Sequence, residues 1–500
     1  MNWWDWMVLV LYFGALCFIF LFSLVQLNLL LLYRKAHSKS DDQARPPSPD
    51  NWPTVTVQLP VYNEKYVMER LLRAVARLDY PLDKLEIQVL DDSTDETTDI
   101  IAGFVANDTS GISISHIRRP ERSGFKAGAL AYGMTQTSSD FVAIFDADFV
   151  PDPSFLKESI PLFANERVGV VQTRWGHLNR GYCPLTRLQA FGLDGHFTVE
   201  QSGRNEGGHF INFNGTAGVW RTKTIHEAGG WSSDTLTEDL DLSYRAQLLG
   251  WQFVYREDVE SPAELPVELN ALRSQQYRWN KGAAECARKN LWKVWKTPQV
   301  SLKSKIHASF HLLNSSIFIS VLLGAVLSVP VMSIKQAFFV QSHIFTGASL
   351  FLLSLVILYF FYREASLRAQ PNLSWSQFIG LFFNFLSLSM GLSLHNAIAV
   401  FEGFIGRKTP FVRTPKFNVY SAEDDWISNQ YRQSKVATIT FLELAFGLYF
   451  LSAIWYGIQL GDYGLVPFHI LLTYGFFSLV GLSVKQQWMQ KKKSPLFGKQ

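Results

Sequence analysis

The chain has 500 residues, 48% of them hydrophobic and 14% aromatic, and its 46 Lys and Arg nearly balance 43 Asp and Glu. The net charge of +3, with no basic stripe interleaved with aromatic residues, excludes a nucleic-acid-binding protein. Cys17, Cys183 and Cys286 are too widely spaced to predict a disulfide framework or a zinc site. Apolar residues concentrate at the start and after about residue 305, so we expect a globular middle domain between membrane segments.

The first segment predicts a transmembrane helix over residues 1–35. Residues 7–32 are almost uncharged and long enough to span a bilayer, which needs roughly 20 apolar residues. Three tryptophans near the start suit one membrane interface, and Arg34 and Lys35 follow the apolar stretch. Because Lys and Arg collect on the cytoplasmic side, we expect the N-terminus outside. The polar, Pro-rich residues 36–53 then predict a linker.

Residues 54–305 alternate between strand-like and helix-like patterns. The expected strands lie at 54–60, 85–93, 112–117 and 141–150, and the expected helices at 64–77, 95–105 and 126–135. Such alternation predicts a parallel sheet with helices on both faces. In sheets of this kind, ligands bind at the carboxyl ends of the strands.

Acidic residues occupy two of these strand ends. Asp91 and Asp92, followed by Ser93, can accept hydrogen bonds from a base and a ribose, although the same residues would also cap the next helix. Asp146 and Asp148 are alternate residues of a strand pattern, so both carboxylates can reach one cation. Mg²⁺ prefers one or two carboxylates together with phosphate oxygens and water. The second pair therefore predicts a site for a divalent metal.

Two further features have both a functional and a structural interpretation. Lys126 opens a predicted helix between glycines, and a helix N-terminus with a lysine suits a diphosphate, whereas most lysines are simply solvated. Glu238, Asp239 and Asp241 crowd together just ahead of an amphipathic run. Acids are favourable at a helix N-terminus. The same acids could equally supply a catalytic base held in a pocket.

Residues 306–500 predict a second membrane region. Its apolar stretches lie at 309–332, 344–362, 437–458 and 464–484, which with the first helix makes about five spans. The basic content of the intervening loops predicts that the C-terminus lies inside. The apolar stretch 378–402 lies between two inside loops, and one helix of roughly 36 Å is too short to cross twice, so we expect it to be interfacial or re-entrant. Glu443, within a predicted span, should face an interior, a water-filled cavity or a neighbouring helix.

Eight stretches, in this order, resemble motifs of membrane-embedded family 2 glycosyltransferases. They are QLPVYNE, VLDDSTDET, RSGFKAGAL, FDADFVP, VQTRWGHLN, FNGTAGVWR, TEDLDLSYRAQLLGW and QQYRWNKG. The closest likeness is to the cellulose synthase superfamily, and within it to the plant-type mannan synthases and xyloglucan-backbone glucan synthases. The resemblance implies an α/β GT-A (Rossmann-like) cytosolic glycosyltransferase domain, inserted between transmembrane α-helices.

The resemblance also implies roles for individual residues. The nucleotide sugar would be bound by the strand-end acids and two basic residues, namely Asp91, Asp92, Lys126, Asp146 and Arg278. Mg²⁺ or Mn²⁺ would be held by Asp146 and Asp148. The acceptor would meet the FNGT stretch and parts of the last two motifs, namely Phe213, Asn214, Gly215, Thr216, Glu238, Gln275 and Trp279. Asp239 would be the general base, with Glu238 and Asp241 as support and cap.

The loop 403–435 resembles the gating loop of cellulose synthases. Phe411, Thr414 and Lys416 fit the spacing of that loop, whereas Arg413 stands where a valine is usual and Pro415 stiffens the chain. The alternative is a basic loop on the membrane surface.

Together these features predict a processive, inverting hexosyltransferase. Inverting sugar transfer needs one base, cationic groups at the leaving diphosphate and an aromatic platform for a sliding chain, without a carboxylate nucleophile. The expected donor is UDP-glucose or GDP-mannose, with a slight preference for UDP-glucose, and the product a β-glucan, or a β-mannan or glucomannan, carried across the plasma or inner membrane or the Golgi membrane. The alternatives are a non-processive lipid glycosyltransferase, similar to ceramide glucosyltransferases, and a non-catalytic transporter.

Overall fold

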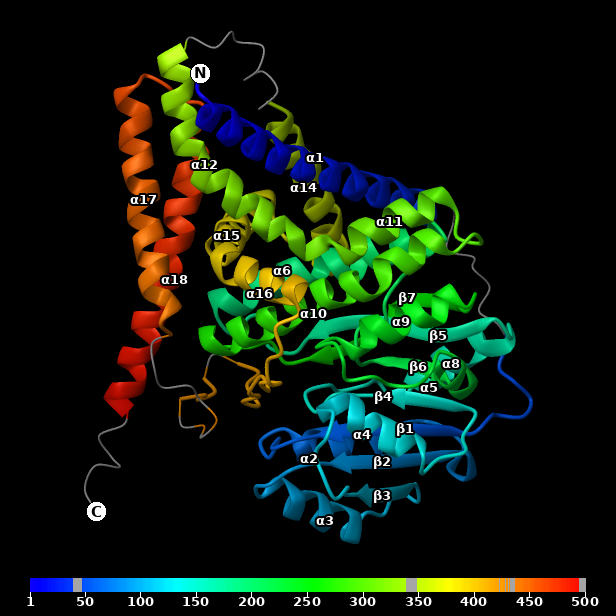
Figure 1. The fold of residues 1–500 in the computed structure, drawn as a ribbon. Helices are drawn as coiled ribbons and strands as arrows, with labels where there is room; N and C mark the ends of the chain where they lie inside the picture. Colours follow the sequence, from blue (N-terminus) through cyan, green and yellow to red (C-terminus); the bar gives the residue numbers. More distant parts are fainter. Residues whose placement is uncertain are drawn as a thin grey trace.

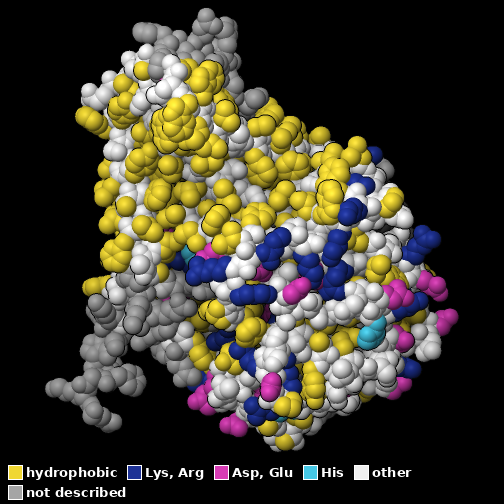
Figure 2. Space-filling view, viewed as in Figure 1, with side chains coloured by type: hydrophobic (Ala, Val, Ile, Leu, Met, Phe, Trp, Pro, Cys, Tyr) yellow, Lys and Arg dark blue, Asp and Glu magenta, His cyan; other side chains and the backbone are white. Residues whose placement is uncertain are grey.

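The structure is a computed structural model that describes residues 1–38, 47–338, 349–421, 423–427, 429, 431 and 437–493. An α/β domain forms its lower part, and long helices stand above it (Figure 1). Helix α1 runs along the top of the molecule, and α17 and α18 pair at one side. Hydrophobic side chains cover the visible face of this helical part, with Lys and Arg gathered along its lower margin (Figure 2).

Within the described residues, seven strands form one sheet in the order β3-β2-β1-β4-β6-β5-β7. They are β1 (Val55–Val61), β2 (Leu85–Asp91), β3 (Ser113–Ile117), β4 (Phe141–Ile144), β5 (Val168–His177), β6 (Gly218–Arg221) and β7 (Gln252–Ala263). The four predicted strands are present and pair in parallel, as expected. The sheet as a whole is mixed, because β6 runs antiparallel to both β4 and β5. Strand β4 ends at Ile144, earlier than predicted, which leaves the second acidic pair in the segment beyond the strand.

Helices cover both faces of this sheet, as predicted. The helices of the domain are α2 (Met68–Val75), η1 (Leu82–Lys84), α3 (Thr97–Asn107), α4 (Phe125–Met134), α5 (Phe155–Ser159), η2 (Ile160–Ala164), α6 (Pro184–Gly195), the π-helical η3 (His196–Glu200), α7 (Gln201–Glu206), α8 (Thr222–Glu227), α9 (Glu238–Leu248) and α10 (Leu269–Lys296). Residues of α2 and α5 fill the core on one face, and residues of α4, α8 and α9 fill the core on the other.

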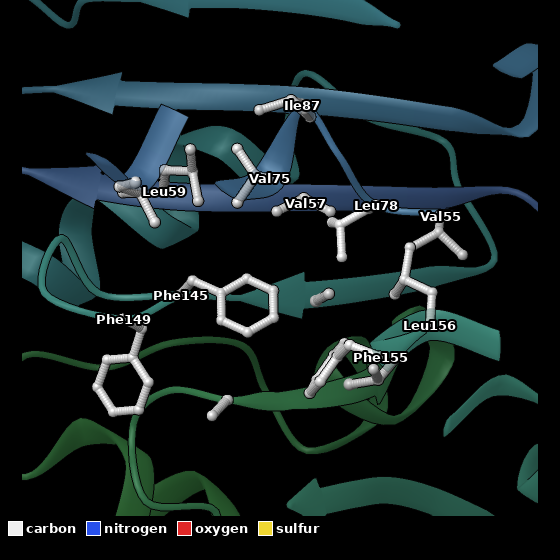
Figure 3. Close-up of a cluster of buried hydrophobic side chains, with 14 of the residues drawn as sticks. Val55, Val57, Leu59, Val75, Leu78, Ile87, Phe145, Phe149, Phe155 and Leu156 are labelled. Carbon is white, nitrogen blue, oxygen red and sulfur yellow. The ribbon is translucent and has the colours of Figure 1, made fainter. Parts of the chain in front are cut away.

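Alternation along β1 explains the first core. Val55, Val57 and Leu59 point to one side of the strand and are fully buried. Figure 3 shows them with Ile87 of β2 and Phe145, which follows β4, in one apolar cluster. Burying each such side chain contributes about 1.5–3 kcal/mol, so this cluster fixes the strand ends from which the acidic pairs extend.

The remaining helices form the upper layer. They are α1 (Trp3–Ser38), α11 (Leu302–Leu312), η4 (Asn314–Ser316), α12 (Ile317–Phe338), α14 (Ser349–Ala369), α15 (Trp375–Gly391), α16 (Ser393–Ile405), α17 (Ile439–Gln459) and α18 (Val466–Lys493). In the described part, the helices long and apolar enough to cross a membrane lie at Trp3–Ser38, Asn314–Ala337, Ile439–Gln459 and Val466–Gln490. Four of the five predicted spans therefore have a matching helix.

The two other membrane predictions have different outcomes. Residues 344–348 of the predicted span 344–362 lie outside the described residues, and α14, which continues it, is not among the four apolar helices. The stretch 378–402 is not one helix but the pair α15 and α16, bent by 50°, which forms either a broken span or a re-entrant loop. Helix α1 also continues to Ser38, three residues beyond the predicted end at 35, and residues 39–46 of the predicted linker lie outside the described residues.

Glu443 of α17 contacts a neighbouring helix, one of the arrangements expected for it. Its side chain is fully buried, and its Oε2 lies 2.5 Å from Nη2 of Arg273 on α10. Arg273 also donates to Ser483 of α18 at 3.3 Å. This ion pair ties α10 to the two C-terminal helices. A buried pair of this kind is worth little net stability, but removing one partner leaves an uncompensated charge.

Candidate active site

One open cavity lies where the ends of β1 and β4 meet the start of α9, the middle of α10 and the loop after α16. Most of the predicted site residues line it, namely Asp92, Lys126, Asp146, Asp148, Asn214, Gly215, Glu238, Asp239, Gln275, Arg278, Trp279, Phe411, Thr414 and Lys416. These residues are spread over more than 300 positions of sequence, and the fold brings them to one place.

The two acids after β4 each contact a lysine. Nζ of Lys126 lies 2.5 Å from Oδ1 of Asp146, and Nζ of Lys416 lies 2.6 Å from Oδ2 of Asp148. The described residues contain no group of three His, Cys, Asp or Glu that could hold a metal ion by itself. Two carboxylates facing an open cavity fit a divalent cation that takes its other ligands from a diphosphate and water.

Asp239 lies in the first turn of α9 and faces this cavity. Its Oδ1 accepts a hydrogen bond from the N–H of Leu240 at 2.8 Å. Burial, and then the neighbouring carboxylate of Glu238, raise the pKa of Asp239 to about 7. A carboxylate with such a pKa can take a proton from a hydroxyl near neutral pH. The site thus contains a group suited to general-base chemistry.

Asp241, from the same acidic cluster, has a different environment. It is fully buried and outside the cavity, and it accepts hydrogen bonds from Arg245, Lys289 and Asn290 at 2.8–3.0 Å. It therefore holds α9 against α10 rather than capping the helix. Thr237 at the N-cap position makes no side-chain capping hydrogen bond.

The middle of α10 brings a cation and an aromatic ring to the cavity. Nη2 of Arg278 donates to Oγ1 of Thr414 at 2.9 Å, and its guanidinium lies 4.6 Å from the ring centroid of Phe411. Burial lowers the pKa of Arg278, although the nearby carboxylate of Asp146 opposes this. Trp279 lies beside it, with its ring centroid 6.5 Å from that of Trp175. The cavity thus combines a partly buried cation with an aromatic wall.

Comparison with known proteins agrees with this geometry. Residues 53–282 match the family model described as Glycosyltransferase like family 2. Residues 53–282 thus form a domain similar to the family 2 glycosyltransferases. It is 44% identical over 261 residues to Glucomannan 4-beta-mannosyltransferase 7 of Arabidopsis thaliana, covering 51% of this chain and 47% of that protein. It is 46% identical over 262 residues to Probable glucomannan 4-beta-mannosyltransferase 4 of Oryza sativa subsp. japonica, covering 51% and 48%.

The chain thus spans about half the length of these curated relatives. Among solved structures, a mannosyltransferase from Pyrobaculum calidifontis in complex with GDP-Man and Mn²⁺ matches with a TM-score of 0.53 and 18% identity. The match covers 81% of this chain and 99% of that one. At this identity the match establishes the fold alone, which is the GT-A fold implied by the sequence motifs.

In the glycosyltransferase domain, three predicted residues do not reach the cavity. Asp91 is buried and accepts hydrogen bonds from the Ser93 N–H, Thr98 and His116 at 2.8–2.9 Å. Burial opposes ionisation, but these hydrogen bonds, led by that of His116, keep the pKa of Asp91 below its usual value. Asp91 is therefore a buried structural residue, but it does not cap the next helix as the alternative expected, because the N-cap residue of α3 is Glu96. Of this acidic pair, Asp92 faces the cavity.

Phe213 and Thr216 are the other two. Phe213 is fully buried, with its ring centroid 5.5 Å from that of Trp220. Oγ1 of Thr216 accepts from the N–H of Asp146 at 2.9 Å, so Thr216 positions the backbone of the acidic pair. Only Asn214 and Gly215 of the FNGT stretch line the cavity.

The glycosyltransferase domain also places residues in the cavity that the sequence analysis did not single out. The guanidinium of Arg122 lies 3.3 Å from the ring centroid of Tyr62, beside Asp92. Trp175 and His177 also line the cavity. All four lie within or beside quoted motif stretches, but nothing in a motif indicates which of its side chains face inward. The packing of the strand ends decides this.

The loop after α16 closes the cavity from the side of the helical layer. Arg413 forms an ion pair with Glu64 at 2.7 Å, at the end of β1. Burial raises the pKa of Glu64 to about 7, against the effect of Arg413. The backbone N–H groups of Phe417 and Asn418 donate to Glu264 at 2.7 and 3.0 Å. The loop thus contacts the glycosyltransferase domain through specific bonds, unlike the alternative of a loop lying only on a membrane surface.

Proposed function

We propose that this chain is an inverting β-mannosyltransferase that extends a β-mannan or glucomannan backbone with mannose from GDP-mannose. The observation that carries the proposal is the single cavity in which Asp239, Asp146, Asp148, Arg278 and Trp279 meet. The names of the relatives, which are glucomannan mannosyltransferases, and the GDP-Man in the fold neighbour support this donor. The slight preference for UDP-glucose finds no support there.

The transfer step follows from the residues around the cavity. Asp239 accepts the proton of an acceptor hydroxyl as its oxygen attacks the anomeric carbon of the donor. The bond between that carbon and the diphosphate oxygen breaks on the opposite side, so the configuration inverts and GDP leaves. Lys126 and Arg278 stabilise the charge that develops on the leaving diphosphate. A divalent cation held by Asp146 and Asp148 would supply further charge stabilisation there.

Processive elongation is supported by the parts of the site that come from α10 and the loop after α16. Trp279 offers an aromatic face that binds a sugar without fixing the register of the chain. Phe411, Thr414 and Lys416 would act as a gating loop that follows the donor through its cycle. The product would leave between the helices above the domain, with the bilayer as their surroundings.

The domain boundaries and the membrane orientation belong to the same proposal. We place an N-terminal membrane helix at 1–35, a linker at 36–53, a cytosolic domain at 54–305 and a membrane region at 306–500. Arg34 forms an ion pair with Glu364 and Arg368 with Glu257, so basic ends of α1 and α14 meet beside the domain. Because basic ends face the cytoplasm, this supports an N-terminus outside and a C-terminus inside.

The test uses the full chain in nanodiscs with radiolabelled GDP-mannose or UDP-glucose. We expect high-mass product from GDP-mannose that endo-β-mannanase degrades, and loss of transfer with EDTA that Mg²⁺ or Mn²⁺ restores. Asp239→Asn should abolish transfer, while Asp83→Asn, an exposed aspartate in η1, should not. A single sugar on lipid would instead identify a lipid glycosyltransferase. Unchanged transfer by Asp239→Asn would overturn the mechanism.

A further inference from the structure

The turn between α6 and α7 is a π-helix, His196–Glu200. Single π-turns inside helices widen the backbone and often occur at functional sites. Across this turn, Nδ1 of His196 lies 2.7 Å from Oε2 of Glu200. Its other ring nitrogen, Nε2, lies 3.1 Å from Oδ1 of Asn214, which lines the active-site cavity. The transfer chemistry described above uses neither His196 nor Glu200.

Asn214 is held firmly by its neighbours. Its Oδ1 also accepts a hydrogen bond from Nδ2 of Asn212 at 2.7 Å, and its N–H donates to Oε1 of Gln172 at 2.9 Å. With the carboxamide oxygen occupied by His196 and Asn212, the amide hydrogens are the groups that Asn214 can offer. One of them makes only a long contact of 3.4 Å to the carbonyl of Asn212. The arrangement suits donation to a sugar hydroxyl.

The opposite end of this hydrogen-bonded chain reaches the first membrane helix. Oε1 of Glu200 accepts from Nε2 of Gln26 on α1 at 2.6 Å, and from Arg204 at 3.3 Å. Gln26 is 4% exposed and Arg204 3% exposed. A buried amide in an apolar helix costs free energy unless it is hydrogen-bonded. Breaking the contact between Gln26 and Glu200 would therefore be unfavourable. Glu200 therefore links α1 to the π-turn.

The same turn supports the aromatic wall of the cavity. Phe197, the residue after His196, stacks on Trp175 with ring centroids 4.7 Å apart, and Trp175 in turn faces Trp279. One short element thus contacts both the amide of Asn214 and the aromatic wall, which the proposed function assigns to the acceptor sugar. Gln26 on α1 is its connection to the helical layer.

We propose that His196 and Glu200 are positioning residues that orient Asn214 toward the acceptor sugar, and that Gln26 couples this orientation to the first membrane helix. The proposal rests on the proposed function, because it takes the ligand at Asn214 to be a saccharide acceptor. His196 acts through Asn214 and touches no reacting atom. Its loss should therefore change acceptor use and leave donor binding intact.

The test measures kinetics of the full chain in nanodiscs with a manno-oligosaccharide acceptor. We expect His196→Ala to lower acceptor kcat/KM by about tenfold, the effect of one hydrogen bond, with donor KM unchanged. His196→Gln, which keeps an amide donor, should recover part of the loss. Combining His196→Ala with Asn214→Ala should add nothing to Asn214→Ala alone, because both act through one contact. Gln26→Leu should show the same pattern with a smaller effect.

His226→Ala, an exposed histidine on α8, is the matched control and should match the unmodified chain. Additive losses in the double variant, or a change in donor KM alone, would overturn the proposal. If the unmodified chain transfers no sugar to any saccharide, the proposed function itself fails. If His196→Ala cannot be recovered as folded protein, His196→Gln and Gln26→Leu carry the same comparison with Asn214→Ala.

A second, independent observation concerns the surface where α10 ends and α11 begins. The exposed basic and large apolar residues of this α10–α11 corner are Arg288, Trp292, Lys293, Trp295, Lys296, Leu302, Lys303 and Ile306. Trp292 and Leu302 are 67% and 65% exposed. No Asp or Glu occurs in the sequence between Glu285 and Glu364. Among the residues that the structure describes, Lys293, Lys296 and Lys303 form no ion pair with a carboxylate.

The place of the corner in the chain indicates its partner. Helix α11 leads directly into the apolar helix at Asn314–Ala337, so the corner lies within a few turns of a predicted membrane boundary. Exposed tryptophans and lysines together are typical of a surface that meets lipid headgroups. Basic residues near a membrane surface bind anionic lipid, and each strengthens the binding about fivefold in general. We infer that this corner binds the headgroups of anionic phospholipids.

The test compares nanodiscs of phosphatidylcholine with and without phosphatidylglycerol. Native mass spectrometry should find phosphatidylglycerol retained preferentially on the unmodified chain. Joint replacement of Lys293, Lys296 and Lys303 by Gln should reduce that preference about tenfold or more. Joint replacement of the exposed Arg73, Arg77 and Lys223 by Gln, the same change of charge elsewhere, should not. Equal losses in both variants, or no preference at all, would overturn the inference; the latter is also what a protein-binding surface would give.

Discussion

The two halves of the cavity are built in different ways. The half that we assign to the donor is lined by residues at the ends of neighbouring strands of one sheet, from Tyr62 after β1 to Asp148 after β4. The half that we assign to the acceptor is lined by residues of α9, α10 and the loop after α16, and the π-turn lies behind it, in contact with Asn214 and Trp175. Arg278 is a proposed donor ligand that comes from α10. We expect the sheet to keep the donor half fixed, whereas the acceptor half can respond to the helical layer. The expected effects below test this division.

The largest expected effect is at Asp239. Replacing it with Asn removes the base, and we expect kcat to fall about 10³-fold, within the range for general-base catalysis. Substitution of Asp241, in the same helical turn, should instead lower stability and leave kcat unchanged. Asp241→Asn weakens hydrogen bonds that tie α9 to α10, so the protein should unfold at a lower temperature while the folded fraction keeps its activity. Steady-state kinetics with thermal unfolding of both variants separates the two roles.

Substitution of Gly215 should have the next largest effect on kcat. Its φ is +80°, and a Cβ there would lie 3.0 Å from Oδ2 of Asp239 and 3.4 Å from Nζ of Lys126. Gly215→Ala should therefore displace the base and lower kcat about 100-fold. Gly230 has a similar φ of +70° with nothing within 4 Å of an added Cβ. Gly230→Ala should only strain the backbone, at a stability cost of about 1–2 kcal/mol. Equal kinetic losses in both would contradict this assignment.

The acidic limb of the pH profile should reveal the same base. Because burial and Glu238 raise the pKa of Asp239 to about 7, its base form is present above that pH and lost below it. We expect kcat to fall about tenfold per pH unit on the acidic side. The free energy of unfolding should change in the opposite direction from kcat as the pH falls. The folded state holds this proton more tightly than the unfolded chain, so Asp239 destabilises the fold above pH 7 and less as the pH falls toward 4.

A substitution at Asp239 distinguishes the titration of this carboxyl from acid denaturation of the whole protein. Asp239→Asn should lower the rate about 10³-fold at every pH, and the pH dependence of unfolding should flatten between pH 4 and 7. A rate that is independent of pH from 6 to 8 in the unmodified chain would contradict the pKa of Asp239.

Site residues were predictable where the signal lies within a short stretch of sequence, and not where a residue is positioned by distant parts of the chain. Asp146 was predictable as a site residue because an apolar strand run ends just before it, and a strand end is visible in the sequence. Asp91 has the same sequence signal, yet it faces inward, because His116 on the adjacent strand reaches its carboxylate. His196 gave no signal, since a π-turn has no residue pattern of its own. Its partner Glu200 is in turn bonded to Gln26, which is 174 residues away in sequence.

The fold shows the same distinction. The parallel strands β1 to β4 follow from alternation within short windows, whereas the antiparallel β6 is set by its partners β4 and β5. A re-entrant stretch was one of the two expected arrangements, but the position of the bend between α15 and α16 was not predicted, because their combined apolar stretch has no proline. Packing decides it: Gly391, just before the bend, lies against the backbone of Gly475 on α18.

Trp279 should have a smaller, qualitative effect on the acceptor side. Loss of the aromatic face in Trp279→Ala should shorten the polymer and lower acceptor kcat/KM about tenfold, while Trp279→Phe keeps most of the length. Gel filtration of the radiolabelled product measures the length directly. A full-length product from Trp279→Ala would show that this ring is not part of the acceptor site. Donor KM should be unchanged in both variants, since the ring comes from the acceptor half.

The smallest effect is expected at the nucleoside end, where the two acids of the first pair can be set against each other. Asp92 faces the cavity and binds Arg119 at 2.6 Å, so Asp92→Asn should raise donor KM a few-fold by loosening that side of the pocket. Asp91→Asn should leave donor KM unchanged but lower stability by about 1–3 kcal/mol, because buried hydrogen bonds are disturbed. Isothermal titration with GDP and denaturant unfolding measure these separately. The reverse pattern would place Asp91 at the nucleotide, as the sequence resemblance implied, and would mean that the donor half rearranges on binding.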